Sequence, residues 1–345
     1  MIKRAVFIAL ACVLIVPAFA AGKAPLPTGL KGWREAVITT SDGEAWDTFL
    51  TRTAGWSLRA QGDIDPVLIQ AWGLPSHVTG QERLYANPGT ASGFIRLLLL
   101  KGADQAMIRA DSRPWDTGGH FDLNVRVAGL RAMRDTMIRQ GWQGDSAPVQ
   151  YTFGPYEVIE WIARGPDGVR LALIERLAPP PEGWPHLKAM SRTFNATQSV
   201  RDMQAARRFY EDVLGMQLYL EYLGASKEPG PNVLGLPHDV ATGVKREVYI
   251  LHPQGVNEGS IELLAFQGAS GSDMSLSAKP YNLGVSALRY EVEDLDTVTM
   301  TLRTRGAAFE FEQPIAMRVV PYGSVRLNTL VSPEGARLDL FQREE

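Results

Sequence analysis

The sequence predicts an α+β fold built from four modules, each with the order strand, helix and three strands, grouped into two domains. Three observations predict it. The 345-residue chain repeats itself with a period of about 165 residues, which suits a duplicated domain rather than a solenoid. The Gly-Leu-Pro loop at 73–77 returns at 235–239, and the turn and strand at 165–174 return at 332–341. The segment 178–183, between the two halves, is too rich in proline for regular structure.

These observations divide the chain into five segments. Their bounds are a signal peptide at 1–20, a linker at 21–32, a first domain at 33–177, a Pro-rich linker at 178–189 and a second domain at 190–343. After removal of the signal peptide the chain is long enough for two domains of ordinary size.

The first twenty residues have the pattern of a secretory signal. Lys3 and Arg4 precede an apolar run at 5–16, and small residues at 18 and 20 suit a cleavage site. The apolar run is too short to cross a bilayer well. Cys12 is the only cysteine and lies inside this segment, so the processed chain is expected to have no disulfide and no cysteine ligand. The expected location is the periplasm or the medium.

The charge distribution excludes some classes of partner. The net charge is −3 and no basic run is present, so electrostatic binding of nucleic acid is not expected. No later apolar stretch is long enough to span a membrane once the signal has been cleaved. A small molecule is the expected partner, and a homodimer is possible.

The most specific local pattern lies at 194–222. A strand is expected at 194–200, and Asp202 is placed to cap a helix. Apolar residues then recur at helical spacing from Ala205 to Leu214. Gly215 suits the left-handed residue that ends a helix, and an extended pattern resumes at 216–222.

This block resembles the opening of a module of the vicinal oxygen chelate superfamily, which includes glyoxalase I, the bleomycin- and fosfomycin-resistance proteins and the extradiol dioxygenases. The resemblance implies that each domain curls a mixed sheet around one cavity. It also implies a metal site with one ligand from each of four strands, usually His, Glu, His and Glu.

The metal positions can be examined one by one in the second domain. Seven residues before Asp202 stands Asn195. The second family position is Glu262, in the strand expected at 260–264. The next two positions hold Ala287 and Asp339. Both histidines of the family pattern are replaced, and zinc, nickel and iron sites rely on nitrogen or sulfur ligands. We therefore expect no metal and no other cofactor.

The first domain departs further from the family pattern. Its matching positions hold Glu35, Arg96, Asp122 and Ala172, with His120 two residues before Asp122 on the same strand face. A cation at the second position repels a metal. We expect Arg96 to pair with Glu35 or Asp122 in a buried ion pair, and we keep Arg96 and His120 as candidate substrate-binding residues.

The side chains that remain in the second domain suggest acid–base chemistry. Glu262, without a metal and in a partly apolar cavity, is expected to have its pKa raised by burial and to act as a base. Arg289 and Asn195 are candidates to stabilise an oxyanion. Tyr249, Thr197 and Asp339 are candidates to bind substrate.

Three functions remain open at this point. The first is an exported, glyoxalase-like lyase or isomerase that needs no metal and uses Glu262 as its base. The second is a non-catalytic protein that binds or sequesters a small molecule, as bleomycin-resistance proteins do. The third is a protein whose cavities are filled by side chains and that acts through its surface. Whether the chain is an enzyme is left undecided, because a fold does not determine a function.

Overall fold

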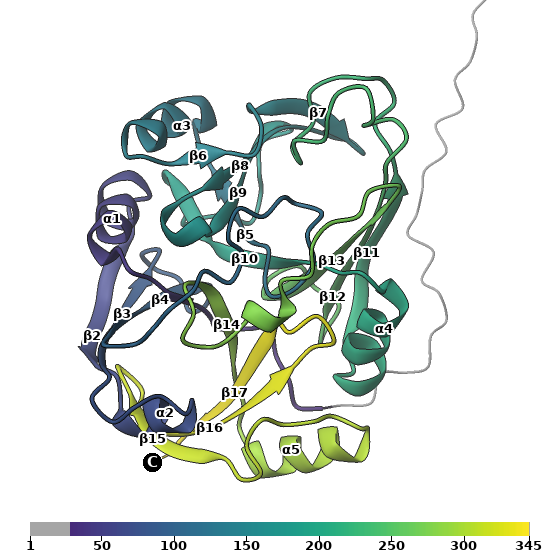
Figure 1. The fold of residues 1–345 in the computed structure, drawn as a ribbon. Coiled ribbons are helices and arrows are strands. Elements are labelled where there is room, and N and C mark those ends of the chain that lie inside the picture. The colour runs from purple at the N-terminus through teal and green to yellow at the C-terminus, as the bar shows by residue number, and fades with distance from the viewer. Residues whose placement is uncertain (1–27, 345) are drawn as a thin grey trace, which may run out of the picture.

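The computed structural model describes residues 28–344, which form two large mixed β-sheets (Figure 1). The strand order in the first sheet is β15-β16-β17-β14-β1-β4-β3-β2. The order in the second sheet is β11-β12-β13-β10-β5-β9-β8-β6, and β7 also pairs with β8. The signal peptide expected at 1–20 and most of the linker at 21–32 lie outside the described residues.

Each sheet draws its strands from two separate parts of the chain. The strands of the first sheet are β1 (Glu35–Thr39), β2 (Ser57–Asp63), β3 (Thr79–Ala86), β4 (Phe94–Lys101), β14 (Gly284–Glu291), β15 (Ile315–Val319), β16 (Gly323–Val331) and β17 (Arg337–Arg343). The strands of the second sheet are β5 (Asp122–Val127), β6 (Gln143–Gly144), β7 (Val149–Phe153), β8 (Tyr156–Arg164), β9 (Arg170–Ala178), β10 (Met190–Ser199), β11 (Gln217–Gly224), β12 (Lys245–His252) and β13 (Ser260–Gln267).

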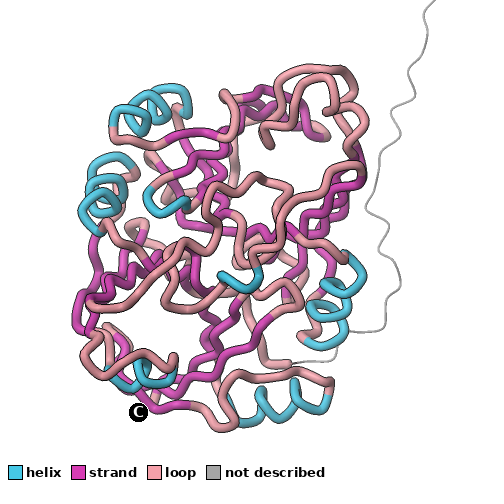
Figure 2. The backbone as a smooth tube through the Cα atoms, viewed as in Figure 1, coloured by secondary structure: helices cyan, strands magenta, loops and turns pink. Residues whose placement is uncertain are grey.

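The helices are short and lie around the outside of the molecule (Figure 2). They are α1 (Gly43–Thr48), continued by the π-helical turn η1 (Phe49–Thr53), α2 (Pro66–Ala71), α3 (Leu130–Arg139), α4 (Met203–Arg207), continued by the π-helical turn η3 (Arg208–Val213), and α5 (Leu295–Thr304). Two single turns complete the set, η2 (Pro166–Gly168) and η4 (Ser275–Ser277). Within residues 28–344 no helix is both long and apolar enough to cross a membrane.

The predicted cap of α4 is confirmed. The carboxylate of Asp202 accepts a hydrogen bond of 2.9 Å from the backbone N–H of Ala205, which is one of the free donors of the first helical turn. Asp42 and Asp294 cap α1 and α5 in the same way. Gly215 follows η3 with a φ of +72°, a conformation that favours glycine. The repeated cap is the local feature that marks these three modules.

The pairing of modules differs from the expected one. The first sheet joins the first and fourth modules through antiparallel pairing of β1 with β14, and Glu35 lies opposite Arg289. The second sheet joins the second and third modules through β10 and β5, and Asn195 lies opposite Asn124. The α+β class is confirmed, but neither half of the chain builds a sheet by itself. Residues expected to share a cavity are therefore redistributed between the two sheets.

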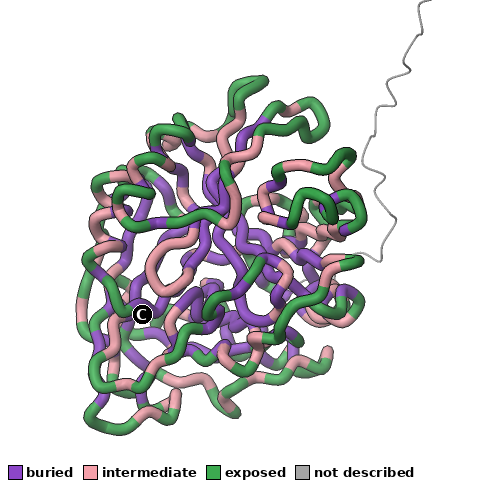
Figure 3. Tube along the Cα trace, turned by 45° about the horizontal axis from the view of Figure 1, so that its top comes forward, coloured by how far each residue is buried: buried purple, intermediate pink, exposed green. Residues whose placement is uncertain are grey.

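The core has three main parts, and buried segments fill the middle of the molecule (Figure 3). The largest part packs the helices against both sheets and includes Trp46 and Trp142, whose ring centroids are 5.5 Å apart. A second cluster around Val37 and Leu98 fills the inner face of the first sheet, the face that bears Ala287. A third cluster around Phe121 fills one end of the inner face of the second sheet.

Candidate functional site

The inner face of the first sheet carries a closed network of charged side chains. Arg96 donates hydrogen bonds of 2.6 and 3.0 Å to Glu35 and one of 2.7 Å to Glu82. Arg289 lies 3.2 Å from Glu35 and 3.3 Å from Asp339. The expected pairing of Arg96 with Glu35 is confirmed. Asp122, the other partner considered for Arg96, belongs to the second sheet.

This network leaves little room for a ligand. The hydroxyl groups of Tyr322 and Thr329 donate to Glu35 and Asp339, each at 2.8 Å. Burial raises the pKa of Glu35, but the adjacent Arg96 guanidinium outweighs it and brings the pKa to about 2. The cavity beside Arg289 and Asp339 measures about 10 Å³, roughly the space of one water molecule. The charged groups of Arg96, Arg289 and Asp339 therefore all have partners within this network.

The inner face of the second sheet is different. Thr197 on β10 pairs with Asp122 on β5 at one side and with Glu262 on β13 at the other. Directly paired residues on neighbouring strands point to the same side of a sheet, so these three side chains form one row. The expectation that Arg289 stands beside Glu262 is wrong, because Arg289 lies on β14 of the first sheet.

Glu262 is an unpaired carboxyl group. Among the described residues its side chain has no hydrogen-bond or ion-pair partner, although it keeps partial contact with solvent. Burial raises its pKa to about 8, and the nearby charges of Asp122 and Glu160 act in the same direction. Burial also raises the pKa of Asp122 to about 7, against a hydrogen bond with Thr197. The expected upward shift at Glu262 is confirmed.

Asn195 is engaged in the sheet itself. Its side-chain oxygen accepts a 2.7 Å hydrogen bond from Asn124, and its amide donates one of 2.7 Å to Ser260. The same Asn124 amide group lies 3.0 Å from the Thr197 hydroxyl and 3.3 Å from Asp122. Asn195 thus shares the face of Glu262, but its polar atoms already have partners.

Two further candidates point away from Glu262. Tyr249 pairs with Leu263, the neighbour of Glu262, so it lies on the opposite face, with the guanidinium of Arg207 4.2 Å from its ring. The ring of His120 instead contacts the first sheet, where its Nε2 lies 3.0 Å from the carbonyl oxygen of Arg337. Burial lowers the pKa of His120 to about 4, so the ring is neutral at neutral pH. The expected role of Tyr249 beside Glu262 does not fit this placement, and His120, expected on the strand face of Asp122, contacts the first sheet instead.

Sequence reasoning missed Arg126. It follows Asp122 and Asn124 at alternate positions of β5, which places it on the same face as Glu262. Its guanidinium carbon lies 4.9 Å from the ring centroid of Phe194 and 5.9 Å from that of Trp184. Alternation along β5 places Arg126 on the face of Asp122. It places Arg126 on the face of Glu262 only if β5 is known to pair with β10.

Aromatic side chains stand at the ends of the second sheet. Tyr151 on β7 donates its hydroxyl hydrogen to Glu160 on β8. Phe153 on β7 meets Tyr222 on β11 edge to face, with 6.3 Å between ring centroids, and the two rings are 41% and 39% exposed. Because β7 and β11 belong to opposite ends of the strand order, the contact shows how far the sheet curls (Figure 1).

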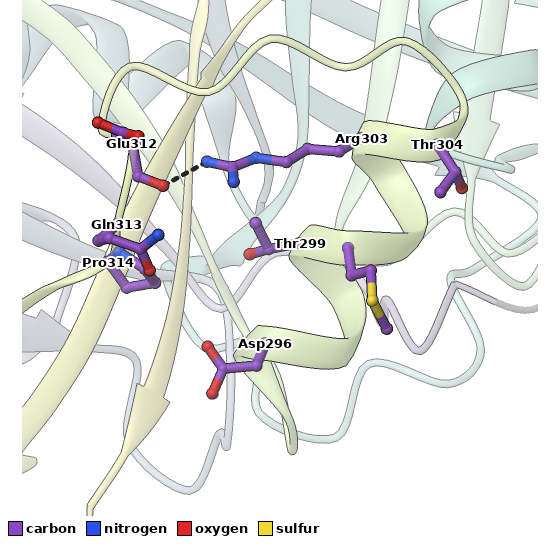
Figure 4. A pocket seen from close by; sticks show the side chains of 8 residues that line it. Asp296, Thr299, Arg303, Thr304, Glu312, Gln313 and Pro314 are labelled. Atoms are coloured by element: carbon purple, nitrogen blue, oxygen red, sulfur yellow. Dashed lines mark hydrogen bonds between the residues drawn. The ribbon is translucent and has the colours of Figure 1, made fainter.

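A groove on the surface is a weaker candidate. It measures about 520 Å³, is open to solvent and lies between α5 and the segment before β15 (Figure 4). Arg303 crosses it and donates to the carbonyl oxygen of Glu312, and Asp296 pairs with Arg326 at 2.7 Å. Two of its charged side chains, Arg303 and Asp296, thus already have partners, and the groove stays in contact with water.

The donor set of the second sheet does not fit a transition metal. The four family positions that meet there are Asp122, Ala172, Asn195 and Glu262, which offer no nitrogen ligand, and the oxygen of Asn195 is already hydrogen-bonded. Throughout residues 28–344 no three His, Cys, Asp or Glu side chains are grouped so that they could hold a metal ion. These residues therefore do not support a reaction that depends on a bound metal.

Comparison with known proteins agrees with this architecture. A family model described as the glyoxalase/bleomycin resistance protein/dioxygenase superfamily matches residues 193–315. A search among curated protein sequences finds no match.

Solved structures resemble almost the whole chain. Glyoxalase I from Zea mays is 16% identical with a TM-score of 0.58, and the match covers 90% of this chain and 92% of that one. A putative dioxygenase from Bacillus subtilis is 13% identical with a TM-score of 0.54, and the match covers 92% and 86% of the two chains. At such identities the likeness shows the fold alone.

Proposed function

We propose that this chain, which matches the family model of the glyoxalase/bleomycin resistance protein/dioxygenase superfamily over residues 193–315 and has the fold of glyoxalase I over nearly all its length, is an exported protein that acts on a small organic molecule. The molecule binds to the inner face of the second sheet, and Glu262 serves as the base of a lyase or isomerase reaction that needs no metal. Export rests on the signal pattern at 1–20.

One observation carries this proposal: Glu262 is an unpaired, partly accessible carboxyl group with a pKa of about 8. A base works best when its pKa lies near the operating pH, because it is then both available and strong enough to take a proton. Asp122, with a pKa of about 7, lies in the same row, separated from Glu262 by Thr197. Two carboxyl groups that titrate near neutrality can serve as acid and base together.

A non-catalytic binding function is the second candidate. The observation that favours it is the aromatic rim of the second sheet, where Phe153, Tyr219 and Tyr222 are all exposed. Such rings give an apolar ligand a surface to stack on, and binding needs no proton transfer. The two functions share a site and differ in the part played by Glu262.

Hydrogen exchange distinguishes the two. Phenylacetone has an aromatic ring and acidic C–H bonds beside a neutral carbonyl group. Protein in heavy water is expected to speed deuterium incorporation at those carbons, followed by NMR, and Glu262→Gln is expected to abolish the increase because an amide cannot accept the proton. Glu228→Gln, on an exposed loop, is the matched control and should leave the exchange rate unchanged.

The outcomes separate the alternatives. Loss of exchange with retained binding of phenylacetone in Glu262→Gln supports proton transfer by Glu262. Binding without any acceleration by the wild-type protein favours the non-catalytic function. Acceleration that survives in Glu262→Gln contradicts the role of this residue as the base.

A further inference from the structure

We propose that Arg126 and Arg176 form an anion-recognition site on the inner face of the second sheet, so that the ligand carries a carboxylate group joined to an apolar, planar body. The inference rests on the proposed ligand site and adds the chemical class of its occupant. It assigns the binding of that group to two arginines that the sequence alone did not single out.

The first step is the position of Arg126. It lies on the face of Asp122 and Asn124, at the next alternate position of β5. Burial and the neighbouring Glu160 raise the pKa of Tyr151 well above its usual value, Glu262 adds to the increase, and Arg126 opposes it. A single tyrosine is therefore within electrostatic range of both Glu262 and Arg126, which suits one ligand that contacts both.

The second step is that Arg126 lacks a counterion. Two fully buried arginines of this protein bind carboxylates: Arg96 binds Glu35, and Arg170 lies 2.7 Å from Asp145. Within the described residues the guanidinium of Arg126 has no ion pair and no hydrogen bond, and its Nε is buried without a partner. A buried donor without an acceptor is costly, so a guanidinium with no ion pair and no hydrogen bond favours a group supplied from outside.

The third step is a second cation beside the first. Arg126 on β5 lies opposite Ile174 on β9, and Arg176 is the next residue on that face of β9. Arg176 stacks on Tyr156 at 4.2 Å and likewise has no ion pair among residues 28–344. Burial lowers the pKa of Arg126, and the like charge of Arg176 lowers it further. An anion bound between the two guanidinium groups relieves that repulsion.

The nearest carboxylate does not fill this role. Glu160 acts electrostatically on Arg126, but it forms no ion pair with it in the described part of the chain and accepts the hydrogen bond of Tyr151 instead. The rings of Phe194 and Trp184 lie beside the Arg126 guanidinium, and no side chain of the described residues accepts a hydrogen bond from its N–H groups. A planar fork of donors matches the two oxygens of a carboxylate. The neighbouring rings can also receive a flat apolar body.

Three probes with one ring and different charge test the inference. Benzoate, benzylamine and benzyl alcohol are titrated into the full chain at pH 6.5 and followed by ligand-observed NMR. We expect benzoate to bind at least about tenfold more tightly than the other two, and Arg126→Gln to remove that preference. Arg131→Gln is the matched control, because Arg131 lies exposed on α3 and should not affect binding.

The inference is overturned if the three probes bind alike, if none binds, or if Arg126→Gln keeps the full preference for benzoate. Thermal unfolding checks that each variant folds. Should Arg126→Gln fail to fold, Arg176→Gln, whose side chain is partly exposed, must itself weaken benzoate binding. Failure of the benzoate test does not decide the proposed function. That function is tested by deuterium exchange into phenylacetone, which is neutral and whose exchange depends on Glu262.

Discussion

Replacing Glu262 by glutamine is expected to stabilise the protein, and increasingly so as the pH rises. The folded protein disfavours the ionised form of this carboxyl group, which is partly buried, unpaired and close to Asp122 and Glu160. Its pKa is raised from 4.5 to about 8, so the folded state keeps a proton that the unfolded state has already released. Stability is therefore lost as the pH rises from about 4.5 to about 8. Glutamine has the same shape and no charge, so the variant lacks this loss.

The magnitude follows from the change in pKa. Each pKa unit corresponds to 1.36 kcal/mol, so the raised value sets an upper limit of about 5 kcal/mol at pH 9. Glu262 keeps partial contact with water, which reduces the expected gain to about 2–3 kcal/mol. At pH 4 both proteins carry a neutral side chain here, and the gain should vanish.

Thermal unfolding of both proteins between pH 4 and pH 9 measures this difference. The melting temperature of Glu262→Gln should exceed that of the wild type by a few degrees at pH 9 and match it at pH 4. Glu228→Gln, which changes an exposed carboxylate, should show no such trend. A difference that is independent of pH, or a destabilised Glu262→Gln at pH 9, would refute the assignment of Glu262 as an unpaired buried acid.

Two further predictions concern charge. Arg96→Met should lower the free energy of unfolding by about 3–5 kcal/mol in denaturant titrations, because it leaves Glu35 and Glu82 buried without their cation. Lys31→Gln, which breaks an exposed pair, should leave the free energy of unfolding almost unchanged. If Arg96→Met changes the free energy of unfolding as little as Lys31→Gln does, the network is not sealed from water. Benzoate affinity should fall as the pH rises from 6 to 9, because Asp122 and Glu262 ionise at about pH 7 and 8 and then repel the anion; an affinity that is constant or rises contradicts the shared face.

The sequence predicted local features well, because they depend on neighbouring residues. Asp202 and Gly215 mark the two ends of one helical segment through backbone requirements that any fold must meet. The sequence did not predict which module pairs with which to form a sheet. The opening strand of each module pairs with its own last strand at one edge, as β1 does with β4, and leaves the other edge free. Nothing in the repeat says which other module occupies that edge.

The site was predicted in part for the same reason. Asn195, Thr197 and Glu262 belong to a single module, so alternation along its strands sufficed to place them on one face. Arg289 was assigned to that face through the expected neighbour, and the actual neighbour supplies Arg126 instead. A wrong prediction of which modules pair therefore assigns the wrong arginine to the site, but it still assigns the correct carboxylate, Glu262.

The exchange of modules also imposes an order on folding. The contact between Glu35 and Arg289 spans 254 residues, whereas that between Asn124 and Asn195 spans 71. All strands of the second sheet lie between Asp122 and Gln267, and the strands of the first sheet come before and after this segment. Closing a short loop costs less chain entropy and happens sooner. During synthesis the face that bears Glu262 can assemble before β14 is available to pair with β1, so we expect the second sheet to form before the first is complete.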